Sequence, residues 1–172
     1  MQAAIYHRYG PPEAVVQVED IDKPVPKDNE VLIKVRTASV NPLDCVVKGR
    51  PHIVRIMSGL RKPRDIRLGV DVAGQVEAVG RTVTRFKAGD AVFGSCRGAF
   101  AEYACASESK VVFKPDKVTF EQAASAPVAG LTALQGLRDK CQVQPGQKVL
   151  INGAAGAWVP SQCRSPNRLA QR

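Results

Sequence analysis

The sequence predicts a mainly β fold with flanking helices, in which a compact antiparallel barrel is followed by linking helices and the first strand of a further domain. Up to about residue 118, short runs of alternating hydrophobicity are separated by Pro and Gly, which is typical of small barrels and sandwiches. At Thr119 the hydrophobic period changes from two to about four, which indicates helices. No apolar run approaches the ~20 residues that a bilayer-spanning helix needs.

The expected barrel strands are short and bounded by turn residues. Asn41 and Pro42 open a short helix between two of them, because Asn caps helices and Pro suits their first position. The expected strands are Ala3–His7, Ala14–Val18, Val31–Ala38, Leu68–Val79, Ala91–Gly94, Ala99–Ala106 and Lys110–Lys114.

Two helical stretches and one strand are expected beyond the barrel. Thr119 and Gln122 fit a capping box, in which the two residues satisfy each other's backbone N–H groups. Helical patterning continues through Ala123–Ala126 and, after a proline, through Val128–Lys140. A strand is then expected at Lys148–Asn152.

The formal net charge of +9 raises the question of a nucleic-acid partner. Its distribution argues against one. Three arginines lie in the last nine residues, and the basic cluster between Lys48 and Arg67 contains no aromatic residue on which bases could stack. We expect a solvated basic loop there, with attraction of a phosphate-bearing cofactor as the alternative, and no nucleic-acid partner.

The five cysteines and the N-terminus indicate a cytoplasmic protein. The cysteine count is odd and no two cysteines form a CxxC pair, which favours reduced thiols over a disulfide framework. The first residues read as a strand and lack the apolar stretch of a signal peptide. We therefore expect no membrane partner.

Seven motifs occur in a fixed order over about residues 1–156. Each is weak alone, but the ordered set resembles the medium-chain dehydrogenase/reductase superfamily, most closely its zinc-free, quinone oxidoreductase-like branch. The motifs are Val31–Val35, Asn41–Asp44, Leu68–Gly74, Val83–Phe93, Gly98–Tyr103, Ala129–Ala133 and Gln144–Gly153.

The resemblance implies a GroES-like barrel on the substrate side and a Rossmann domain that binds NADP(H) or NAD(H) across a cleft. The implied reaction is hydride transfer to a quinone or enone, with the protein supplying orientation and hydrogen bonds. Asn41 and Asp44 are the implied catalytic residues, and Asn41 and Thr132 would also contact the cofactor. Gly153 and Gly156 would begin the glycine turn that holds the pyrophosphate.

Each of the three polar residues also has a purely structural explanation. Asn41 can be only a helix cap, and Asp44 can be an acidic residue that stabilises the first turn through the helix dipole. Thr132 can be a buried helix residue. Both interpretations stay open from sequence alone.

No metal site is expected. In the zinc-containing branch, a Cys near the Asn41–Asp44 segment and a His in a Gly-His-Glu segment bind zinc. Here the second segment reads Gly69-Val70-Asp71, so the His is absent and Cys45 lacks ligand partners. A catalytic zinc needs three protein ligands.

The sequence therefore divides into a barrel over residues 1–118, linking helices with a first Rossmann strand and partial glycine turn over residues 119–156, and a tail over residues 157–172. We expect an inactive, truncated fragment of an enzyme of the quinone or enone reductase type. The alternative is a non-catalytic GroES-like binding module or an inactive gene product. Full-length relatives are expected to form homo-oligomers, and this fragment to self-associate because its last strand lacks partners.

The tail over residues 157–172 reads as disordered and out of frame. It lacks the expected glycines and an apolar stripe, and Pro166 would break a helix begun at Ser161. Ala157-Trp-Val must be encoded GCN-TGG-GTN, and a shift of one base allows Gly-Val-Gly-Thr-Phe-Ala-Val-Gln-Ile-Ala-Lys, which has the missing turn and helical pattern. Resequencing the gene should show a long open continuation with Rossmann patterning in that frame; its absence would refute a frameshift after about Gly156.

Overall fold

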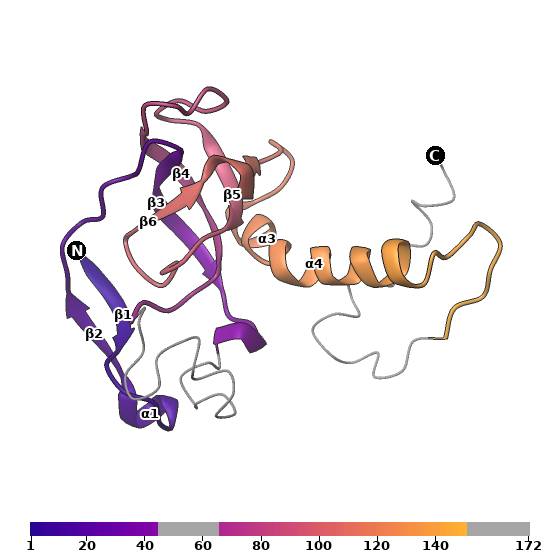
Figure 1. Ribbon diagram of the computed structural model, residues 1–172, viewed down its shortest axis with the longest axis horizontal. Helices are drawn as coiled ribbons and strands as arrows, with labels where there is room; N and C mark the ends of the chain where they lie inside the picture. The colour runs from indigo at the N-terminus through magenta and orange to yellow at the C-terminus, as the bar shows by residue number, and fades with distance from the viewer. Residues whose placement is uncertain (45–65, 151–172) are drawn as a thin grey trace.

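The computed structural model describes residues 1–44 and 66–150, which form two antiparallel sheets and a helical rod (Figure 1). None of the helices in these two stretches is long and apolar enough to cross a bilayer. The elements are β1 (Gln2–Tyr6), α1 (Pro12–Val15), β2 (Val16–Asp20), β3 (Glu30–Ser39), β4 (Asp71–Val79), β5 (Ala91–Ser95), β6 (Tyr103–Ser107), η2 (Glu108–Lys110), β7 (Val111–Phe113), α3 (Phe120–Ala124), α4 (Pro127–Leu134) and η3 (Gln135–Lys140).

The first sheet is a two-stranded ribbon of β1 and β2, paired from Gln2 opposite Asp20 to Tyr6 opposite Val16. The strand expected at Ala14–Val18 is corrected at its start, because residues 12–15 form the single turn α1. Pro12 is the cause, since its fixed φ angle and missing N–H suit the first position of a helix.

The second sheet is a partly open barrel of five strands in the order β6-β3-β4-β5-β7, with every pair antiparallel. The end strands β6 and β7 do not pair with each other. Inward-facing side chains from all five strands form one aliphatic core, in which Val31, Ile33, Val72, Val92 and Val111 are almost completely buried. The mainly β class predicted from the alternating pattern is confirmed.

A glycine allows the two longest strands to approach closely. A Cβ atom on Gly74 would lie 2.2 Å from the backbone oxygen of Lys34, so no other residue fits there without moving the backbone. The register of β3 against β4 shifts between Val35 and Thr37, at the same level of the sheet. This irregularity sets which residues face each other at the end of β3.

Several expected strands are shorter than the sequence indicated. The strand expected at Leu68–Val79 begins only at Asp71, because Gly69 adopts φ +94°, which an extended strand does not allow. The strand expected at Ala99–Ala106 begins at Tyr103, after a turn in which Gly98 has φ +82°. Lys110 belongs to η2 rather than to the last strand.

Helix α3 covers the outer face of the barrel. Ala123 and Ala124 are buried against Ala73 of β4, with Phe93 of β5 and Phe120 packed around them. The capping box predicted for this helix is confirmed. The backbone N–H of Gln122 donates to Thr119 Oγ1, and the backbone N–H of Thr119 donates to Gln122 Oε1.

Helices α4 and η3 form a rod that projects away from the barrel (Figure 1). Leu131 on this rod is 55% exposed, and Leu150 beyond it is 96% exposed. The strand expected at Lys148–Asn152 is wrong for residues 148–150, which carry no strand pairing, and residues 151–152 lie outside the described part. A strand needs a partner for its backbone groups, and none of the described strands lies beside this segment.

We expect the exposed apolar side chains of this rod to cause self-association. A fragment that ends at Gly130 keeps α3 but removes the exposed Leu131, Val149 and Leu150, so it should be monomeric at concentrations where the 172-residue chain sediments as larger species.

A fragment that ends at Lys117 is the matched comparison. It also loses α3, which uncovers Ala73 and Phe93, and should be less stable than the Gly130 fragment by roughly 1–3 kcal/mol. Analytical ultracentrifugation and thermal unfolding measure the two effects. A monomeric 172-residue chain at high concentration would contradict the first expectation.

Candidate active site

A buried carboxylate marks the end of the barrel at which α4 begins. Asp71 is the first residue of β4, and only 1% of its surface is exposed. After the register shift in β3, Ser39 lies directly opposite Asp71, so that the two side chains meet. Ser39 Oγ donates a hydrogen bond to Asp71 Oδ2 over 3.1 Å.

Asp71 also joins the barrel to the helical rod. The backbone N–H of Val128 donates to Asp71, at 3.2 Å from Oδ1 and 3.4 Å from Oδ2. Val128 lies in the first turn of α4, whose N-cap residue, Ala126, provides no side-chain hydrogen bond. Asp71 therefore acts as an N-terminal cap from another element, and its charge is favourable at that end of the helix.

Asn41 is the third partner of this carboxylate. Its Nδ2 donates to Asp71 Oδ2 over 3.4 Å, while its Oδ1 accepts from the N–H of Leu43 over 2.9 Å. Asp44 completes the turn, because its Oδ2 accepts from the N–H of Asn41 over 2.8 Å. The amide of Asn41 is thus fixed from both sides, and residues 42–44 form the short helical turn that the sequence predicted.

Both carboxylates of this cluster are shifted towards protonation. Burial raises the pKa of Asp71 above its ordinary value, against hydrogen bonds from Ser39 and Val128, and the charge of Asp44 raises it further. Burial likewise raises the pKa of Asp44, with the backbone amides of Asn41 and Gly69 opposing the rise. Asp44 Oδ1 is nevertheless buried without a hydrogen-bond partner among the described residues.

The structure brings together two of the residues singled out from the sequence, Asn41 and Asp44, and places a third, Thr132, further along α4. Asn41 and Asp44 share one turn, and Thr132 lies one helical turn beyond Val128 on the same face of α4. The Thr132 hydroxyl donates to the backbone oxygen of Val128 over 2.7 Å, so it is partly committed to its own helix. Gly153 and Gly156 lie outside the described residues.

Sequence reasoning did not identify Ser39 and Asp71 as site residues. The available signal was an acidic residue inside an otherwise apolar strand, since Asp71 precedes Val72 and Ala73. A carboxylate at such a position is seldom buried without partners. The partners themselves depend on the register shift in β3, which no sequence pattern indicated.

Within residues 1–44 and 66–150, no three His, Cys, Asp or Glu side chains are grouped as metal ligands. Cys45, the residue nearest to a family zinc ligand, lies outside these ranges. The absence of zinc therefore stays a prediction from the sequence.

A model of the alcohol dehydrogenase GroES-like domain matches residues 27–116. The match covers more than half of the chain, which belongs to this family and so to the medium-chain dehydrogenase/reductase superfamily, as the motifs indicated. Similar proteins place it in the quinone oxidoreductase-like branch: it is 37% identical over 166 residues to the quinone oxidoreductase of Sus scrofa. The alignment covers 95% of this chain but 49% of that protein, so the chain spans about half the length of such relatives.

Solved structures agree with this assignment. The quinone oxidoreductase of Coxiella burnetii superimposes with a TM-score of 0.86 at 33% identity, over 99% of this chain and 54% of that one. The Escherichia coli quinone oxidoreductase complexed with NADPH gives a TM-score of 0.82 at 27% identity, over 99% of this chain and 50% of that one.

Replacement of Asp71 by Asn should weaken the junction between barrel and rod. An amide offers one accepting oxygen, so Val128 N–H and Asn41 Nδ2 would compete for it, and we expect a loss of about 1–3 kcal/mol in unfolding free energy at neutral pH. Asp116→Asn is the control, because Asp116 is exposed. Chemical unfolding measures both.

The pH dependence of that loss tests its electrostatic origin. Because the pKa of Asp71 is raised on folding, the wild type gains stability from it at acidic pH and loses this gain as pH rises through the folded-state pKa. The Asn variant lacks this titration, so the stability difference should be larger at about pH 4 than at neutral pH. A difference that grows with rising pH would contradict burial as the main cause.

Proposed function

We propose that this chain provides the substrate side of an NAD(P)H-dependent, zinc-independent reductase of quinones or enones. One observation carries the proposal beyond family membership: the Asn41 amide is held by buried Asp71 at the point where the barrel meets α4. A side chain fixed in this way is preorganised, and preorganised donors favour developing negative charge at low cost.

The residues around Asn41 have different roles in this proposal. One N–H of Asn41 Nδ2 bonds Asp71, and the other has no partner in the described part of the chain, so it can donate to a substrate or nicotinamide oxygen. Asp44 holds the backbone of Asn41 in place through its Oδ2. Asp71 and Ser39 keep the amide from rotating, and so act as positioning residues.

A nicotinamide cofactor would supply the hydride when bound. The donor set fits such a group, because the fixed Asn41 amide can donate to the oxygen of a nicotinamide carboxamide. Thr132 lies one helical turn after Val128, whose N–H bonds Asp71. The relative from Escherichia coli was solved with NADPH. Gly153 and Gly156 are our candidates for its pyrophosphate, within a protein that we expect to be cytoplasmic and, in its full-length relatives, homo-oligomeric.

A chimera tests this function. Residues 1–156 joined to the remaining part of the Escherichia coli relative should oxidise NADPH when a quinone is added, as followed by the loss of NADPH absorbance. Asn41→Ala should lower kcat by roughly tenfold to a hundredfold, the order expected for one aligned donor. Asn29→Ala, at an exposed turn, should leave kcat nearly unchanged. A metal chelator should have no effect.

The 172-residue chain alone serves as the reference. It should show no turnover and bind NADPH with a Kd in the millimolar range or weaker, because Ala157 and Val159 stand at glycine positions of the pyrophosphate turn. A chimera that binds NADPH yet reduces neither quinones nor enones would favour the alternative, a non-catalytic GroES-like binding module. Micromolar NADPH binding by the chain alone would contradict the assignment of cofactor binding to the missing turn.

A further inference from the structure

A cavity of about 570 Å³ lies beside β6, an edge strand of the five-stranded sheet. Its walls come from the segment between Pro24 and Glu30, from β6, from the residues that end and follow β5, and from η2, which connects β6 to β7. Val70 lines it, but the next residue, Asp71, and its partners Asn41 and Val128 do not, so the cavity is separate from the cluster around Asn41. Its volume falls within the roughly 300–1,000 Å³ typical of small-molecule sites.

The charge around this cavity is strongly unbalanced. Four cationic side chains line it, Lys27, Arg67, Arg97 and Lys110, against one carboxylate, Glu30. Lys27, Arg97 and Lys110 are exposed, and their side chains make no ion pair or hydrogen bond with another described residue. A cleft lined by one sign of charge concentrates ions of the other sign.

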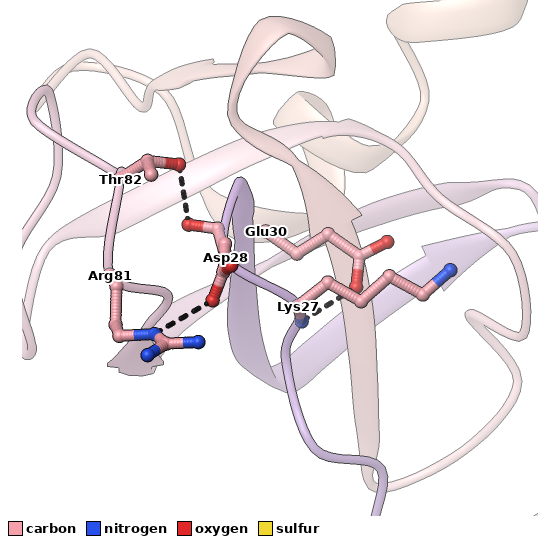
Figure 2. Close-up of polar contacts among 5 residues, drawn as sticks. All are labelled: Lys27, Asp28, Glu30, Arg81 and Thr82. Atoms are coloured by element: carbon pink, nitrogen blue, oxygen red, sulfur yellow. Dashed lines mark hydrogen bonds and ion pairs between the residues drawn. The ribbon is translucent and has the colours of Figure 1, made fainter.

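Hydrogen bonds hold the backbone of the wall that carries Lys27 (Figure 2). Thr82 Oγ1 donates to the backbone oxygen of Asp28 over 2.8 Å, and Arg81 Nε donates to Asp28 Oδ1 over 3.0 Å. The carboxylate of Glu30 accepts from the backbone N–H of Lys27 over 3.1 Å, and no dashed line joins it to the Lys27 ammonium group. The one acidic residue is therefore engaged with its own turn, which leaves the ammonium group available.

Arg67 and two thiols, those of Cys96 and Cys105, also line the cavity. Burial raises the pKa of Cys96 to about 12 and that of Cys105 to about 11, while the positive charge of Arg67 opposes the rise at both. These thiols are therefore neutral at physiological pH and add no negative charge. Val25, Val70 and Ala106 provide apolar wall between the cations.

We propose that this cavity binds a small organic phosphate, with the phosphate group held by the cationic rim and the organic part against the apolar wall. Ser95 adds a hydroxyl at the same wall, whereas the hydroxyl of Ser107 shares a hydrogen bond of 3.1 Å with Ser109. Charged donors that converge on one anion give the stronger class of hydrogen bond. This site does not depend on the reductase proposed above, because it uses none of the same residues.

Titration calorimetry with phenyl phosphate tests the proposal on the full chain. The variant Lys27→Gln, Arg97→Gln, Lys110→Gln should bind about tenfold or more weakly than the wild type, because it loses three charged donors. Its matched control is Arg8→Gln, Lys87→Gln, Lys117→Gln, which removes the same charges from exposed positions outside the cavity and should bind like the wild type.

Thiol labelling locates the site independently. Phenyl phosphate should slow the reaction of Cys105 with N-ethylmaleimide while leaving that of Cys141, which is exposed outside the cavity, unchanged. Equal loss of affinity in the two triple variants, no protection of Cys105, or no wild-type binding at millimolar concentration would each overturn the proposal. Inorganic phosphate that binds as tightly as phenyl phosphate would overturn the role given to the apolar wall.

Discussion

The burial of one carboxylate is the constraint on which the functional end of this molecule depends. Asp71 is removed from water at the start of β4, and a buried charge without partners would be too costly to keep. Its hydrogen bonds therefore recruit donors from three separate segments: Ser39 at the end of β3, Asn41 in the following turn, and Val128 at the start of α4. Hydrogen bonds to Asp71 therefore hold both the Asn41 amide and the first turn of the helical rod against the barrel.

The rest of the barrel makes that burial possible. The close approach at Gly74 and the register shift in β3 bring Ser39 opposite Asp71, while α3 covers the adjoining face of β4 through Ala123 and Ala124. Without α3 this face of β4 would be open to water, and water could replace the protein donors that bond the carboxylate. Packing of small residues thus supports a polar cluster a few residues away.

Most of the architecture could be predicted from the sequence, because alternating hydrophobicity, turn residues and the capping box at Thr119 are local signals. The strand boundaries were predicted wrongly where the backbone conformation of one residue outweighed the alternating hydrophobic pattern. Pro12 starts the helix α1 where a strand was expected, and the positive φ of Gly69 keeps β4 from starting before Asp71. Asn41 and Asp44 stood out because they belong to a motif. Ser39 and Asp71 did not, since their pairing depends on a shift of register, and register is a property of two strands rather than of either one.

The unpaired boundary between β6 and β7 has a mechanical meaning for the barrel. In a closed barrel every strand is fixed to two neighbours, and widening the cylinder requires ladder hydrogen bonds to break. Here β6 and β7 can move apart without breaking a ladder hydrogen bond. The direction in which the barrel deforms most easily is therefore set by its strand order. Small changes in the girth of this barrel should therefore concentrate along that boundary, while the paired strands around it move as one body.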